Sequence, residues 1–184
     1  MAHLLKKSYL TYIFLLLYVI LLGLGLSHHE FWMDESHHWL IARDSHSIAD
    51  LINNYRYDGH PILWVSCLWV IGQFTSKVIF VQIFHAFIAT LIAIIILFKS
   101  PFKRQYNLLF IFGYYPLFEY GVLSRNYALT VLFLLLFCVS FKKGEKLLLP
   151  FLFLGLVSNS HLFGLILSVI LSLRILYDKR SELK

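Results

Sequence analysis

The sequence has little charge for its length. Asp, Glu, Lys and Arg make up 14% of its 184 residues, whereas 59% of the residues are apolar and 17% are aromatic. A typical soluble domain carries about 25% charged residues. This composition excludes an ordinary water-soluble domain and predicts a polytopic membrane protein with several apolar segments in the bilayer.

Cysteine and the signature motifs of several enzyme classes are also scarce. The two cysteines, Cys67 and Cys138, lie far apart inside apolar segments, so the sequence indicates neither a disulfide framework nor a cysteine zinc site. A glycine-rich phosphate loop, a GxSxG elbow and a CxxC pair are absent from the sequence. These absences argue against nucleotide-driven chemistry.

The net charge of +6 comes from basic clusters that separate apolar runs, which is a topology signal rather than a nucleic-acid-binding face. A helix that crosses the bilayer needs about 20 residues. The expected spans are Ser8 to Leu26, Val78 to Phe98, Tyr106 to Leu123, Tyr127 to Phe141, Lys146 to Val157 and Leu162 to Tyr177.

A further apolar segment, Pro61 to Phe74, is too short for a span and is expected to be re-entrant. If it does not cross, the clusters around Lys6, Lys99, Lys142 and Arg174 all face the cytoplasm, as the positive-inside rule requires. The sequence therefore predicts an all-α bundle of about six transmembrane helices in the plasma (inner) membrane, with both termini cytoplasmic.

The first outer loop, residues 27 to 77, is expected to contain amphipathic juxtamembrane helices. One follows Asp34 or Ser36 as its N-cap, and another starts at Ser47, where SIAD fits a capping pattern. Apolar residues follow Ser47 at helical spacing. They are Ile48, Leu51, Ile52 and Tyr55.

Most polar side chains that are suited to catalysis or ligand binding fall in the outer loops. Asp34 and Glu35, just outside the first span, are suited to act as a general base, as metal ligands or as partners of a cation, and equally to cap a surface helix in solvent. Arg125 is suited to bind phosphate, and the alternative is a salt bridge to Glu119. Asn126 and Tyr127 extend this polar edge or cap a helix.

Six of the nine histidines lie between residues 28 and 60. With the nearby acids they could build a divalent-metal site, for which Glu35, His38 and His60 are the candidate ligands. The adjacent pairs lack the spacing of a chelating helix motif, so packing and hydrogen bonding at the membrane interface explain most of these histidines better than metal binding does. His60, beside a glycine and a proline, is the strongest functional candidate among them.

Four segments, taken in order, resemble the N-terminal half of membrane glycosyltransferases of the GT-C fold. The resemblance is especially to bacterial relatives of protein O-mannosyltransferases and of the lipid A aminoarabinose transferase, the family 39-like enzymes. MDESHHWLIARD resembles their first-loop acidic motif, and YDGHPILWVSCLW their x-G-H/K-P-P-L segment, with Ile62 in place of the second proline. EYGVLSRNYAL and SNSHLFGLIL resemble the second and third outer motifs.

The resemblance implies transfer of a sugar from a polyprenyl-phosphate donor to a hydroxyl of a glycan, lipid or protein, by an inverting single displacement at the outer face. Asp34 would be the catalytic base, with Glu35 supporting it or helping to hold a metal. Arg125 and Tyr127 would bind the donor phosphate. The residues expected to line the site are Asp58, His60, Glu119, Asn126 and His161. The one candidate cofactor is a divalent metal, because metal dependence varies among such enzymes.

Full relatives continue for several more spans, so residues 1 to 184 are expected to be a single transmembrane domain truncated at its C-terminus. The alternative is a non-catalytic subunit or remnant that binds a second membrane subunit or lipid. A metal-dependent membrane hydrolase that uses the first-loop histidines is a third possibility. None of these has a nucleic-acid partner.

Overall fold

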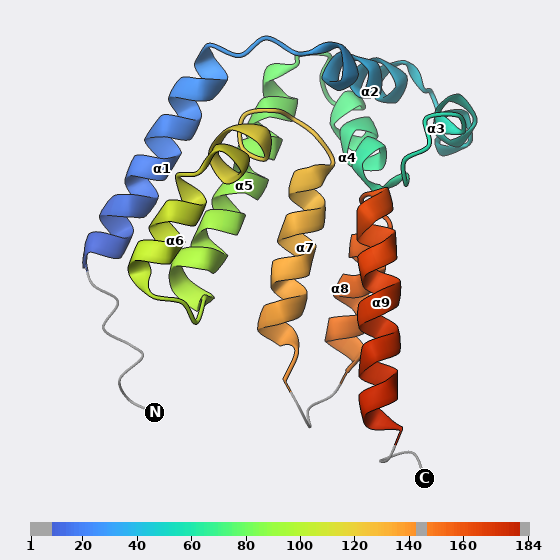
Figure 1. Cartoon of the computed structure of the whole chain (residues 1–184). Coiled ribbons are helices and arrows are strands. Elements are labelled where there is room, and N and C mark those ends of the chain that lie inside the picture. The colour runs from blue at the N-terminus through green and yellow to red at the C-terminus, as the bar shows by residue number, and fades with distance from the viewer. Residues whose placement is uncertain (1–8, 143–146, 181–184) are drawn as a thin grey trace. The chain divides into compact units, whose positions relative to one another are not determined.

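The computed structural model describes residues 9 to 142 and 147 to 180, and every regular element in these ranges is a helix (Figure 1). The elements are α1 (Tyr9–Ser27), α2 (Met33–Asp44), α3 (Ile48–Tyr55), α4 (Leu63–Gly72), α5 (Ile79–Lys99), α6 (Arg104–Ile111), the π-helix η2 (Tyr115–Glu119), α7 (Tyr127–Ser140), α8 (Leu148–Ser158) and α9 (Leu162–Lys179). The all-α prediction is therefore confirmed for these residues. The basic cluster at Lys6, the predicted span starts at Ser8 and Lys146, and Lys184 lie outside the described residues.

Within the described ranges, two helices are long and apolar enough to cross a membrane, α1 with 19 residues and α5 with 21. At 1.5 Å per residue they match a hydrocarbon core of about 30 Å. They coincide with the first two predicted spans. The helices α4, α7 and α8 are apolar but have 10, 14 and 11 residues. The shortness expected of the Pro61 to Phe74 segment is thus observed, and the six-span arrangement remains a prediction.

The predicted span from Tyr106 to Leu123 is not one continuous helix. It breaks after α6, where a Cβ on Gly113 would lie 3.1 Å from the carbonyl oxygens of Leu109 and Phe110. Pro116 then removes a backbone N–H and crowds the preceding turn. The chain continues as η2, whose wider turn is closed by a 2.7 Å bond from the Tyr120 N–H to the Tyr115 carbonyl.

The chain divides into two compact units, and the first contains Met1–Ser36 and Lys77–Ala128. In this unit α1 packs against α5 and η2, and α6 packs against α5 and η2. The buried Tyr18 hydroxyl of α1 donates a 2.9 Å hydrogen bond to the Pro116 carbonyl. This bond fastens the first long helix to the π-helix that carries Glu119.

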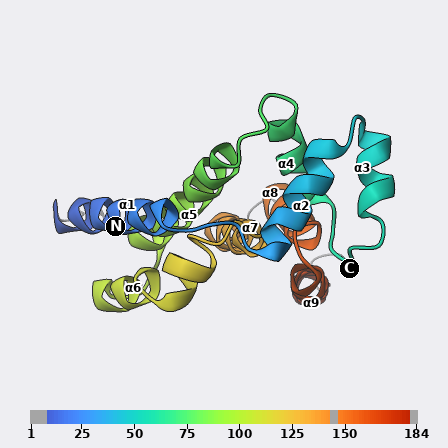
Figure 2. The ribbon, with the colours of Figure 1, turned by 90° about the horizontal axis from the view of Figure 1, so that it is seen from above.

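The second unit contains His37–Ser76 and Leu129–Lys184. Its α8 and α9 lie side by side in both views (Figures 1 and 2), joined by a short turn. Buried Phe137, Leu154 and Ile175 form the core that these helices share with α7. The Leu63 N–H donates to the Asn159 carbonyl at 3.2 Å, which ties the start of α4 to the turn between α8 and α9.

The segment from α2 to α3 in this unit follows its sequence signals. The Ser47 hydroxyl accepts a 3.1 Å hydrogen bond from the Asp50 N–H, so Ser47 caps α3 as predicted. Leu51 and Tyr55 are buried. The indole N–H of Trp69 on α4 donates to the Ser45 carbonyl at 2.9 Å, which holds the α2–α3 turn against α4.

The close approach of α8 and α9 depends on Gly164 having no side chain. A Cβ there would overlap the Val157 carbonyl oxygen and lie 3.1 Å from the Thr130 methyl group. We expect Gly164→Ala to lower the free energy of unfolding by about 1–3 kcal/mol, because the obstructing oxygen is backbone and cannot turn away.

Gly155→Ala is the matched control, because no atom lies within 4 Å of a Cβ at that position. Its helix propensity should leave stability unchanged or raised. Thermal unfolding in detergent micelles, followed by circular dichroism, compares the two variants. Equal melting temperatures would contradict the close approach.

Candidate functional site

The paired acids lie in the first turn of α2, which begins at Met33, two residues earlier than an N-cap at Asp34 would place it. The Trp32 carbonyl accepts the first helical hydrogen bond, from the Ser36 N–H at 2.9 Å. The prediction that Asp34 or Ser36 is the N-cap is therefore wrong, and Trp32 takes that position. The Trp32 N–H in turn donates to Glu35 Oε2 at 3.0 Å, a reach-back contact typical of a glutamate at the third helical position.

Glu35 is only 1% exposed, and both of its carboxylate oxygens are engaged. Oε1 accepts a 2.6 Å hydrogen bond from the Ser124 N–H, and Oε2 lies 2.8 Å from His29 Nε2. A buried carboxylate is tolerable only with such partners. Since Ser124 precedes Arg125, the contact joins the start of α2 to the loop that carries the arginine, and Glu35 positions the two segments.

Arg125 joins two carboxylates in the same unit. Its Nε lies 2.7 Å from Asp34 Oδ2, and its Nη1 donates to Glu119 Oε1 at 3.2 Å. The guanidinium carbon lies 5.3 Å from the centre of the Trp32 ring. The sequence left open whether Arg125 works with Asp34 or pairs with Glu119, and the structure shows it contacting both.

The cluster of Asp34, Glu119 and Arg125 is partly open to solvent. The side chain of Arg125 is 19% exposed and that of Asp34 is 46% exposed. The Tyr114 hydroxyl donates to the second Glu119 oxygen at 3.2 Å. Sequence reasoning missed Tyr114 and Trp32. The only signal for Trp32 was its place two residues before the acidic pair, and the sequence held no signal for Tyr114.

Two further predicted residues follow Arg125 in the chain. Asn126 is buried, and the ring of Tyr127 at the start of α7 lies 6.2 Å from that of Tyr120. The contact of Tyr127 with a donor phosphate and the place of Asn126 in the site lining remain predictions.

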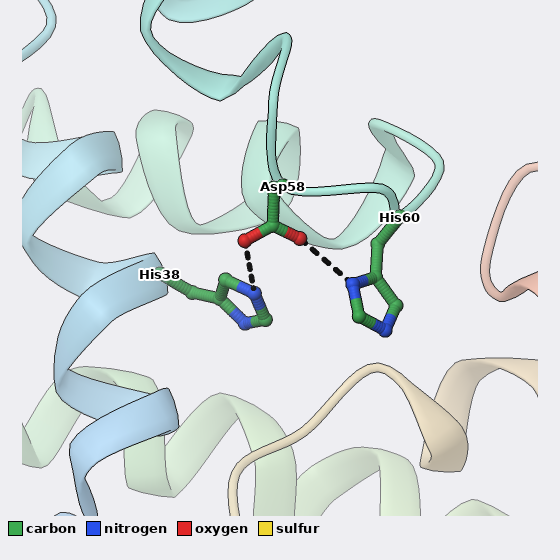
Figure 3. A group of neighbouring side chains, drawn as sticks. All are labelled: His38, Asp58 and His60. Carbon is green, nitrogen blue, oxygen red and sulfur yellow. Dashed lines mark hydrogen bonds and ion pairs between the residues drawn. The ribbon is translucent and has the colours of Figure 1, made fainter.

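In the second unit, Asp58 gathers histidines from two elements (Figure 3). His60 Nδ1 lies 2.7 Å from Asp58 Oδ1, and His38 Nε2 lies 3.2 Å from Oδ2. His37 Nε2 also lies 3.2 Å from Oδ2, although His37 and His38 are adjacent on α2. The side chain of Asp58 is 8% exposed.

The turn that presents Asp58 and His60 depends on the glycine between them. Gly59 has φ +81°, a left-handed conformation that other residues rarely adopt. This turn lets two side chains that are two residues apart approach one another. The glycine of the YDGHP segment thus forms the turn that brings Asp58 and His60 together.

His161 also belongs to this unit, and its ring centre lies 5.4 Å from that of His60. Its Nδ1 accepts a 3.1 Å hydrogen bond from the Phe163 N–H and so caps α9. His161 therefore caps a helix in addition to lying beside His60. Burial and the neighbouring His60 lower the pKa of His161.

Burial also lowers the pKa of His38, against the opposing charge of Asp58. Burial alone would raise the pKa of Asp58, but the neighbouring imidazoles and the Tyr55 hydroxyl hold it below the ordinary value. At neutral pH an anionic Asp58 therefore faces a neutral His38 imidazole, the protonation states that metal ligands require.

The predicted metal ligands separate into two groups. Glu35 Oε1 and Oε2 are taken by backbone and imidazole partners of the first unit. His38 and His60 share Asp58, and one donor atom from each of these three residues lies within 4.8 Å of the others. Asp58, expected only to line a site, is therefore the centre of the histidine cluster.

No family model matches the chain, and no curated protein or solved structure matches it either.

The buried Glu35 gives a stability prediction. Glu35→Ala leaves the Trp32 and Ser124 N–H groups and the His29 imidazole without their acceptor, so we expect the free energy of unfolding to fall by about 3–5 kcal/mol. Glu35→Gln keeps one acceptor oxygen and should lose less. The exposed Glu30→Ala, five residues away, is the control and should unfold like the parent protein in a thermal melt.

Proposed function

We propose that the chain is a GT-C-type membrane glycosyltransferase that moves a sugar from a polyprenyl phosphate to an acceptor hydroxyl at the outer face of the plasma (inner) membrane. The observation that carries the proposal is the 2.7 Å contact between Asp34 and Arg125. These residues lie in two different motifs of the resemblance, which assigns them complementary roles. An inverting displacement needs the base and the phosphate-binding group on opposite sides of one anomeric carbon, so the contact supports a shared site and must open when the donor binds.

Asp34 is the base in this proposal. It takes the proton of the acceptor hydroxyl while that oxygen attacks the anomeric carbon and the bond from this carbon to the phosphate oxygen breaks. The polyprenyl phosphate departs with the bonding electrons, and inversion follows from the single displacement. Arg125 stabilises the negative charge that grows on the departing phosphate.

The resting cluster adds a constraint, because two carboxylates and one guanidinium leave an excess negative charge. A phosphate must therefore displace Asp34 or Glu119 from Arg125 or bind the guanidinium beside them. Arginine has five N–H donors, more than the two carboxylate contacts use. If phosphate displaces Asp34, the same event places the donor and frees the base.

The position of the acids fits a lipid-linked substrate. The candidate span α1 ends at Ser27, and Asp34 follows seven residues later. In a membrane the carboxylate would then lie near the boundary, where a polyprenyl chain in the bilayer can present its phosphate. The six-span topology with cytoplasmic termini is part of this proposal.

The catalytic test compares matched Asp–Arg pairs. We expect Asp34→Asn and Arg125→Ala each to reduce sugar transfer by about 100-fold or more, measured in membranes with a panel of radiolabelled polyprenyl-phosphate sugars. Asp44→Asn and Arg43→Ala disrupt an exposed pair with the same 2.7 Å contact and should leave transfer unchanged. Full transfer by either Asp34→Asn or Arg125→Ala would refute the proposal.

A binding measurement separates the phosphate role from catalysis. Arg125→Ala should weaken binding of polyprenyl phosphate, detected by native mass spectrometry, and leave binding of neutral polyprenol unchanged. A protein that binds polyprenyl phosphate but transfers no sugar would instead be the non-catalytic subunit considered from the sequence.

A further inference from the structure

We propose that His38, Asp58 and His60 form a binding site for one divalent transition-metal ion of the zinc class. The three side chains come from α2 and from the turn between α3 and α4 (Figure 3). All of them lie in the second unit, so the proposal stands whether or not the chain is a sugar transferase that uses Asp34 as its base.

The donor atoms have the separations that a small metal ion needs. In a tetrahedral site with metal–nitrogen distances of about 2.0–2.1 Å, neighbouring ligand atoms lie about 3.3 Å apart. The Asp58 oxygens lie 2.7 Å from His60 Nδ1 and 3.2 Å from His38 Nε2, and the whole set fits within 4.8 Å. Small side-chain rotations therefore suffice to place three donors around one ion.

The backbone and the surrounding side chains hold the donors in place. His38 is buried beside the Tyr55 ring, whose centre lies 5.7 Å from its own. Gly59 permits the turn between Asp58 and His60, and the His161 ring centre lies 5.4 Å from that of His60. A site with fixed ligands loses little conformational freedom on binding a metal.

The cluster also has an open side. The side chain of His60 is 35% exposed, which gives an ion and a water molecule access. Three protein ligands with a fourth position left for water are the pattern of zinc sites that activate a bound oxygen. His37, exposed and 3.2 Å from Asp58 Oδ2, lies close enough to hold this carboxylate in orientation.

The ligand set selects the class of metal. Two imidazoles and one carboxylate suit Zn²⁺ and neighbouring first-row divalent ions, whereas Mg²⁺ and Ca²⁺ prefer oxygen ligands alone. The alternative is that Asp58 merely pairs with the imidazoles. A metal site binds one ion per chain, whereas simple pairing binds no ion stoichiometrically.

The experiment uses the full chain, purified in detergent through a tag without histidines and stripped with a chelator. We expect one equivalent of Zn²⁺ to bind and to raise the melting temperature, and Mg²⁺ to do neither. Co²⁺ should give visible absorption bands from nitrogen and oxygen coordination. Absence of stoichiometric Zn²⁺ binding by the parent protein would overturn the proposal.

Variants locate the ion. His38→Ala and His60→Ala should each weaken Zn²⁺ binding by at least about 100-fold and abolish the Co²⁺ bands. His60→Ala removes a partly exposed side chain, so it keeps the test valid if the more buried His38→Ala does not fold. The control is His46→Ala, an exposed histidine of the same unit, which should bind Zn²⁺ like the parent protein. Unchanged Zn²⁺ affinity in His60→Ala would also overturn the proposal.

Discussion

The first unit depends on a buried charge that is fully hydrogen-bonded. Glu35 cannot leave water without donors, and those donors are the backbone of Trp32, the backbone of Ser124 and the His29 imidazole. Because the donors belong to segments about ninety residues apart in the chain, satisfying this carboxylate fixes the start of α2 against the second loop. The contact between Asp34 and Arg125 follows from that arrangement, since Asp34 adjoins Glu35 and Arg125 adjoins Ser124.

The different environments of Asp34 and Glu35 also follow from the position of α2. Helical neighbours point about 100° apart, so one acid can face the protein interior while the other faces solvent. Glu35 is enclosed, whereas Asp34 remains partly exposed beside the guanidinium. Glu35, enclosed by fixed donors, holds the fold together, and Asp34 has the open position that the proposed reaction requires.

Local signals predicted local structure well. The Ser47 cap, the apolar spacing of α3 and the shortness of α4 all depend on neighbouring residues, and the structure has each of them. The prediction of one span from Tyr106 to Leu123 was wrong as a continuous helix. Hydropathy depends on apolar side chains and does not register the helix breaks at Gly113 and Pro116. The cap of α2 was placed wrongly because Glu35 satisfies the helix start from inside the helix.

The sequence indicated which residues belong to the candidate site, but it did not indicate which of them contact one another. The order of motifs pointed to Asp34 and Arg125, but no spacing rule indicates that Glu35 reaches Ser124. Adjacent His37 and His38 do not look like a chelating motif, yet both reach one oxygen of Asp58 because the Gly59 turn presents that carboxylate to them. Such convergence depends on tertiary structure that a linear pattern does not contain.

The π-helix η2 makes the placement of Glu119 dependent on a single surplus residue. A π-turn corresponds to an α-helix lengthened by one residue, and such turns persist mainly where they serve a function, since their hydrogen bonding is less favourable. Removing one residue between Tyr115 and Glu119 would let the segment relax to α-helical winding and swing the glutamate by about 100° around the axis. Insertions and deletions in this short segment should therefore be far less tolerated during evolution than substitutions of its side chains.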